Sequence, residues 1–209
     1  MNKEIENIER LMTDKGVEFR DFNITGINTR TESDSSKKLI VEGVPCVFDT
    51  ETVLYRGKNY EYREKVATGA FDGADLSDVI FNCNHHGRVY ARTRNGSLGL
   101  TTESDGLHMS AELLSGDEGH AELYRDIENG LIDKMSFAFT IKECEYRYIE
   151  RTDSTPDITV RTITKIDKVY DVSAVDIPAY DTTSISARRS FDAELKWQDY
   201  RKSKKDCPL

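Results

Sequence analysis

The sequence is poor in the residues that build metal and redox sites. Its 209 residues include four cysteines, Cys46, Cys83, Cys144 and Cys207, and no two of them form a Cys-x-x-Cys pair. A zinc ribbon or a redox dithiol therefore cannot be built locally, and ordinary reduced thiols are expected. The sequence also lacks a run of about 18 apolar residues, and it begins with charged residues rather than a signal-peptide core. These absences predict a soluble protein of a reducing compartment.

An excess of basic residues is also lacking. The formal net charge is -9 at pH 7, with 29 Lys and Arg against 38 Asp and Glu. Nucleic-acid binding needs a dominant basic face, so no specific nucleic-acid partner is expected. Histidine is scarce too, and the few candidates for a catalytic base are His85, His86, His108 and His120.

The length allows one domain with a real core and flanking arms. Apolar residues at helical spacing predict a short helix over residues 2–13, and the polar stretch 29–38 is interpreted as a linker. We therefore expect an N-terminal helix and linker arm over residues 1–37, a domain over 38–187 and a basic C-terminal tail over 188–209.

Short runs of Val, Ile, Phe and Tyr between turn residues begin at Leu39 and predict many strands. We place them near residues 39–48, 52–55, 78–85, 88–93, 97–102, 107–113, 137–148 and 158–175. Asn95-Gly96 suits a tight hairpin turn, and one helix is expected over residues 120–128, ending at Asn129-Gly130. The pattern favours a mostly β (α+β) fold, either a barrel or a sandwich with a few peripheral helices.

Ser136 is the most conspicuous candidate for a nucleophile. It lies in a segment with the alternation of a half-buried strand, whose large residues should face a core. On the opposite face of the strand Ser136 is flanked by the small residues Ala138 and Thr140, which should leave room above its hydroxyl group. Periodicity alone does not distinguish it from many other strand serines.

Two further residues could complete a catalytic site with Ser136. His85 ends an extended segment in which Val79, Phe81 and Cys83 share its face, although a histidine in that position is more often a hydrogen-bonded core residue. Asp171 should project from a small, polar strand face like that of Ser136, where a carboxylate could orient an imidazole. The alternative for Asp171 is a surface acid on an edge strand.

A metal site is not expected. Cys83, His85 and His86 are close in sequence, but adjacent histidines on a strand point to opposite faces and cannot both bind one ion readily. A His-Asn-His nuclease site is disfavoured for the same reason, and the acidic charge balance adds to this.

Five motifs follow one another in an order that resembles a known family. They are Thr68-Gly69-Ala70-Phe71, Asn84-His85, Gly96-Ser97-Leu98 with Asp105-Gly106-Leu107, the stretch 127–139 around Lys134-Met135-Ser136-Phe137, and the stretch 170–179 that begins Tyr170-Asp171-Val172-Ser173. In this order they resemble the prohead (capsid maturation) proteases of tailed bacteriophages, which are related in fold to the herpesvirus assemblins. The resemblance covers roughly residues 40–187 and implies an assemblin-like β-barrel.

The resemblance assigns roles to three residues of a serine endopeptidase. His85 matches the family's catalytic histidine, Ser136 its nucleophile and Asp171 the third member, with backbone amides stabilising the oxyanion. The family usually has Glu where this chain has Asp171, and often Asp where it has His86, so His86 stays open as an alternative partner. No cofactor and no metal are implied.

The resemblance also implies the substrates. They would be scaffold protein or the scaffolding segment of the major capsid protein, cut inside the procapsid in the host cytoplasm, and the protease would also cut itself. The basic end of the chain would dock on an acidic scaffold. No membrane is involved, and homo-oligomer formation stays open. The competing hypothesis is a non-enzymatic head-assembly or scaffold-binding module with the same fold.

Overall fold

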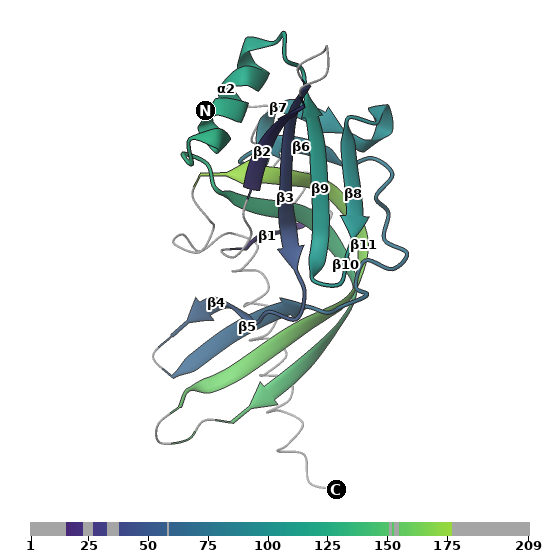
Figure 1. The fold of residues 1–209 in the computed structure, drawn as a ribbon. Helices are drawn as coiled ribbons and strands as arrows, with labels where there is room; N and C mark the ends of the chain where they lie inside the picture. Colours follow the sequence, from purple (N-terminus) through teal and green to yellow (C-terminus); the bar gives the residue numbers. More distant parts are fainter. Residues whose placement is uncertain are drawn as a thin grey trace, which may run out of the picture.

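The computed structural model describes residues 16–22, 27–32, 38–57, 59–150, 152 and 155–176. These residues form mostly strands, with the single α-helix α2 (Glu118–Glu128) and the short 3-10 helix η1 (Thr93–Asn95), as Figure 1 shows. The strands are β1 (Glu18–Phe22), β2 (Ile27–Glu32), β3 (Lys38–Val47), β4 (Thr52–Arg56), β5 (Tyr60–Val66), β6 (Ile80–Cys83), β7 (His86–Arg92), β8 (Leu98–Thr102), β9 (Gly106–Leu113), β10 (Lys134–Ile149) and β11 (Asp157–Val175).

Two sheets enclose one apolar core. The larger has seven strands in the order β1-β10-β11-β5-β4, with β6 beside β11 and β7 beside β6, and the smaller has the order β2-β3-β9-β8. Side chains of both sheets meet in one buried cluster, such as Val41 and Met109 from the smaller and Phe137 and Val172 from the larger. The mostly β prediction is confirmed. Among the described residues, however, the sheets are open and do not close into the expected barrel.

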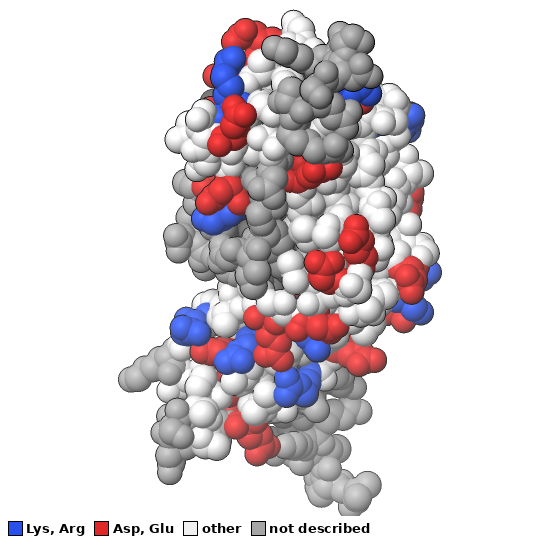
Figure 2. Space-filling view, viewed as in Figure 1, with Lys and Arg blue, Asp and Glu red and all other residues white. Residues whose placement is uncertain are grey.

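The long antiparallel pair β10 and β11 connects two parts of the molecule. Its near ends are buried, with residues 135–140 covered on both faces. At the far end β11 also pairs with β5, and β5 pairs with β4, so that this part extends away from the four-stranded sheet (Figure 1). Acidic and basic side chains alternate on the surface of this extension (Figure 2), where Glu51 pairs with both Arg63 and Arg147.

Most of the strands predicted from Leu39 onward are confirmed, and so is the helix. Asp117 caps α2 by accepting hydrogen bonds from the backbone N–H groups of Gly119 and His120, at 2.9 and 3.2 Å. The helix ends at Glu128 with Asn129 as its C-cap, and Gly130 follows with a left-handed φ of 69°. The chain therefore turns sharply just before β10, which carries Ser136.

Three features of the chain were wrongly predicted or missed. Residues 29–32 belong to β2 rather than to a linker, because Thr-rich polar segments can still pair as an edge strand. Asn95-Gly96 does not join two paired strands: Gly96 is left-handed, but β7 and β8 belong to different sheets. The strand β5 had no counterpart in the prediction.

Several other predictions fall partly or wholly outside the described residues. These are the helix over 2–13 and the basic tail over 188–209. The domain division also stays a prediction, although β1 and β2 of the expected arm pair with strands of the sheets. Cys46, Cys83 and Cys144 are free thiols. A search of the described residues found no helix with the length and apolar character needed to cross a membrane.

Candidate active site

Ser136 lies on β10 between two neighbouring strands. It pairs with Asp21 of β1 on one side and with Ser173 of β11 on the other. The large residues Phe137 and Phe139 are buried in the core, as the alternation predicts. The predicted open space above the hydroxyl group is absent, since Ser136 is 0% exposed. Sequence alternation identifies the two faces of a strand but does not reveal what covers the face with small residues.

His85 approaches Ser136 from a tight turn rather than from a strand face. β6 ends at Cys83 and β7 begins at His86, so Asn84 and His85 form a two-residue hairpin loop. Their φ angles are 53° and 58°, and a positive φ at both central residues is what a type I′ turn requires. Asn tolerates this conformation, whereas for His it costs on the order of 1 kcal/mol, as is common at functional sites. The strand predicted over residues 78–85 therefore extends too far at its carboxyl end, since β6 ends at Cys83.

The turn is held against β11 by two hydrogen bonds. The backbone N–H of Asn84 donates to the carbonyl of Ala174 at 2.9 Å, and that of His85 donates to the hydroxyl of Ser173 at 3.1 Å. The side-chain oxygen of Asn84 accepts from the backbone N–H of Asp176 at 3.3 Å. These contacts fix the position from which the imidazole of His85 extends.

Asp171 lies on the same sheet face as Ser136. It is the register partner of Ala138, while Ser173 is the partner of Ser136, and residues two apart on a strand share a face. The Asp171 side chain is buried, and its Oδ1 lies 2.7 Å from His85 Nδ1. The other ring nitrogen, His85 Nε2, lies 2.6 Å from Ser136 Oγ. The side chain of Asp171, although shorter than that of a glutamate, therefore reaches the imidazole of His85, because the turn lies directly beside β11.

Ser173 is a site residue that the sequence prediction did not include. Its hydroxyl lies 3.1 Å from Asp171 Oδ1 and 3.2 Å from His85 Nδ1, and it also contacts the side-chain oxygen of the buried Asn82. The signal that could have found it is its place two residues after Asp171, on the same face of the strand. Ser173 joins the turn, the carboxylate and the imidazole.

A buried group of charges lies next to Ser136 and was also missed. The carbonyl of Arg20 accepts a hydrogen bond from Ser136 Oγ at 2.9 Å. The guanidinium of Arg20 pairs with Glu64, and Arg161 Nε donates to Glu64 at 2.6 Å. Burial alone would raise the pKa of Glu18, but Arg20 and Arg161 outweigh it and lower that pKa from 4.5 to about 2.

The remaining histidines do not join this site. His86 is exposed, and its Nδ1 contacts the backbone carbonyl of Asn84 rather than Asp171. His120 is a buried residue of α2, and its Nδ1 accepts from the backbone N–H of Leu114 at 3.1 Å. Burial lowers the pKa of His120.

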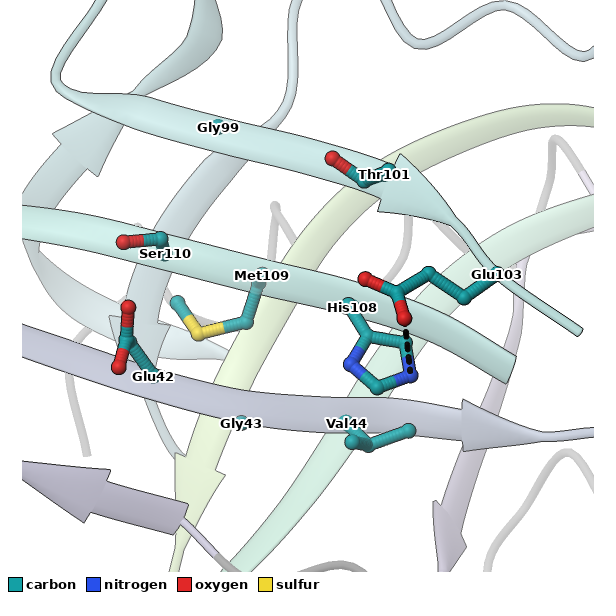
Figure 3. A pocket seen from close by; sticks show the side chains of 9 residues that line it. All are labelled: Glu42, Gly43, Val44, Gly99, Thr101, Glu103, His108, Met109 and Ser110. Atoms are coloured by element: carbon teal, nitrogen blue, oxygen red, sulfur yellow. Dashed lines mark ion pairs between the residues drawn. The ribbon is translucent and has the colours of Figure 1, made fainter. Parts of the chain in front are cut away.

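His108 lies in a separate pocket on the four-stranded sheet, of about 380 Å³, shown in Figure 3. None of its lining residues belongs to the group around Ser136. At one end His108 Nε2 lies 2.8 Å from Asp105 and 4.0 Å from Glu103. These three residues could together hold a cation, but both carboxylates are largely exposed, and exposed acidic groups commonly have no ion.

A serine, a histidine and a carboxylate linked by hydrogen bonds in series are the arrangement of nucleophilic serine hydrolases. Comparison with families of known proteins points to one class of these. The family model of the caudovirus prohead serine proteases matches residues 26–196, most of the chain. The chain belongs to this family of phage capsid-maturation proteases. Comparisons with the curated proteins and with the solved structures gave no match.

Proposed function

We propose that the chain is a serine endopeptidase in which Ser136 is the nucleophile, His85 the general base and Asp171 the group that orients the imidazole. The observation that supports this best is the pair of hydrogen bonds in series, at 2.6 Å from Ser136 to His85 and 2.7 Å from His85 to Asp171. Membership of a serine protease family supports the same assignment.

Each group has a defined task in this mechanism. His85 Nε2 takes the proton of Ser136 as Oγ attacks the carbonyl carbon of the substrate, and it returns the proton to the amine as the peptide bond breaks. Water then hydrolyses the ester on Ser136, with His85 again as the base. Asp171 keeps the proton on Nδ1, so that Nε2 stays free to accept. Ser173 holds the backbone of His85 in place.

The substrates follow from the family. We infer that they are scaffold protein and the scaffolding segment of the major capsid protein, cut inside the procapsid in the host cytoplasm, and that the protease also cuts itself. The relation to the assemblin barrel is part of this proposal. The two sheets packed around one core support it.

The direct test is co-expression with the major capsid protein and measurement of the product masses. With Ser136→Ala, cleavage should fall by about 10⁶, as for other serine hydrolases that lose the nucleophile. Ser110→Ala is the matched control, since Ser110 lies in the separate pocket on the other sheet. Undiminished processing by purified Ser136→Ala would refute the assignment.

One observation favours the alternative of a non-enzymatic scaffold-binding module. Ser136 is fully buried, as a serine with only a structural role would be. A fluorophosphonate probe, which reacts with activated serines, separates the two proposals. The protease should be labelled at Ser136, and the binding module should remain unlabelled while still entering proheads.

A further inference from the structure

The strand β1 occupies the place next to the nucleophile. It pairs antiparallel with β10 over its whole length, from Glu18 opposite Phe139 to Phe22 opposite Met135. Among the strands of the described residues, β1 is the outermost on this side of its sheet. An extended peptide can bind a protein by adding itself to a sheet edge in the same way. β1 therefore has the position and the conformation of a peptide bound along β10.

A backbone carbonyl of β1 lies next to the nucleophile. Arg20 O is 2.9 Å from Ser136 Oγ, and the same hydroxyl lies 2.6 Å from His85 Nε2. In a reacting peptide the carbonyl carbon lies about 3–3.5 Å from the nucleophile. The Arg20 carbonyl lies beside Oγ but turns its oxygen toward the hydroxyl, so β1 lies along the nucleophile in an orientation that does not react. In this comparison Arg20 corresponds to the substrate residue on the amino side of the cut.

The side chain of Arg20 lies in a buried acidic site. Its exposed fraction is 4% and that of Glu64 is 3%. The guanidinium meets both carboxylate oxygens of Glu64, and its Cζ lies 5.8 Å from the ring of Phe139. A forked pair of this kind suits arginine better than any other side chain. Glu64 belongs to β5, so this site remains when β1 is replaced by another strand.

The charges around Glu64 stay balanced when β1 is present, because β1 adds one charge of each sign to the pair of Glu64 and Arg161. Arg161 accompanies Glu64, and β1 adds both Arg20 and, two residues earlier on the same face, Glu18. Glu18 contacts Arg161 at 2.5 Å. An uncompensated buried charge is strongly unfavourable, so a strand with a different charge pattern would bind much less well.

We propose that β1 occupies the substrate position of the protease, and that Glu64 selects extended peptides with an arginine, or less well a lysine, on the amino side of the cut. An acidic residue two positions before that arginine should improve binding, as Glu18 does for β1. This inference rests on the proposed protease function and defines its substrate class.

The test reads the cut sites themselves. Wild-type protein and Ser136→Ala are co-expressed with the major capsid protein, and the ends of all Ser136-dependent products are determined by mass spectrometry. Arginine or lysine should precede the cuts. Glu64→Gln, which keeps the shape and removes the charge, should slow cleavage after arginine by about 100-fold, the loss typical of an unpaired buried charge. Glu143→Gln, at an exposed ion pair with Lys165, is the matched control and should cleave normally.

Each outcome decides between the two proposals. Ser136-dependent cuts without a preceding basic residue would overturn this inference and leave the protease function intact. The absence of any Ser136-dependent cut would overturn both. If Glu64→Gln does not fold, as its melting curve would show, the wild-type cut sites alone decide. Arg20→Ala adds a second measurement: fluorophosphonate labelling of Ser136 should become about tenfold faster, because β1 loses its buried anchor. Unchanged labelling would contradict the occupancy of the substrate position by β1.

Discussion

Replacing Asp171 by Asn tests the third member of the proposed triad. Asp171 Oδ1 lies 2.7 Å from His85 Nδ1, and in the proposed mechanism it accepts the N–H of that nitrogen, which leaves Nε2 free to accept from Ser136. An amide in the same place can donate its own N–H to Nδ1. The proton of the imidazole would then lie on Nε2, and that nitrogen could not accept the hydroxyl proton of Ser136.

The size of the expected fall in kcat depends on which groups still contact the imidazole in Asp171→Asn. The hydroxyl of Ser173, 3.2 Å from Nδ1, can accept the N–H in part of the molecules but carries no negative charge to stabilise the imidazolium. We therefore expect kcat to fall by about 10³ to 10⁴, less than for loss of the nucleophile. KM should change little, because Asp171 is buried and does not reach the position of the peptide at β1.

The assay is cleavage of the purified capsid protein under single-turnover conditions, followed by mass spectrometry, with the rate of fluorophosphonate labelling as a second readout. Asp167→Asn is the matched control, since Asp167 is an acid on the same strand whose carboxylate accepts a hydrogen bond from Thr140, at 3.4 Å. His86→Ala tests the alternative third partner and should leave the rate unchanged. If Asp171→Asn keeps more than about a tenth of the wild-type kcat while His86→Ala loses activity, the assignment of Asp171 is wrong.

Three further predictions concern the surroundings of the site. Ser173→Ala should lower kcat by about tenfold and stability by about 1–3 kcal/mol, because the backbone N–H of His85 loses its acceptor; activity assays and melting curves measure both. The pKa of Glu18 falls from 4.5 in the unfolded chain to about 2 in the folded protein, so ionised Glu18 stabilises the fold above pH 4.5, and this stabilisation is lost as the pH falls toward 2. The melting temperature should therefore drop between pH 4.5 and 2, and the drop should be smaller in Glu18→Gln. The lowered pKa of His120 means that the unfolded chain binds the proton more tightly, so stability should fall as the pH decreases below about 6.5, and His120→Gln should remove this slope.

The sequence predicted those parts of the site that follow strand alternation. Phe137 and Phe139 are buried as expected, and Asp171 shares a face with Ser136. These results need only the two-residue period of a strand and correct pairing of two strands. The same period was misleading at His85, where it suggested a strand continuing through the histidine. A turn with two left-handed residues is easily predicted from Asn-Gly, but not from Asn84-His85, since His rarely adopts that conformation.

The features that alternation could not predict are contacts over long sequence separations. Arg20 and Ser136 are 116 residues apart, and Arg20 and Glu64 are 44 apart. Nothing in the polar sequence around Arg20 distinguishes a strand that covers the nucleophile from a surface segment. The burial of Ser136 therefore follows from which strand pairs with β10, and strand order in a sheet is not encoded in local patterns.

The contact of β1 with Ser136 bears on the reactivity of the nucleophile as well as on its access. The hydroxyl group has one proton and two acceptors at hydrogen-bond distance, the carbonyl of Arg20 and Nε2 of His85. Whenever the proton lies on the carbonyl side, His85 cannot act as the base. A substrate strand in the place of β1 would instead have to present a carbonyl carbon to Oγ, and the hydroxyl proton would pass to His85 as the new bond forms. The position that covers the serine and the position that reacts with it are thus the same, so exchange of β1 for a substrate strand is the step that should control when cleavage begins.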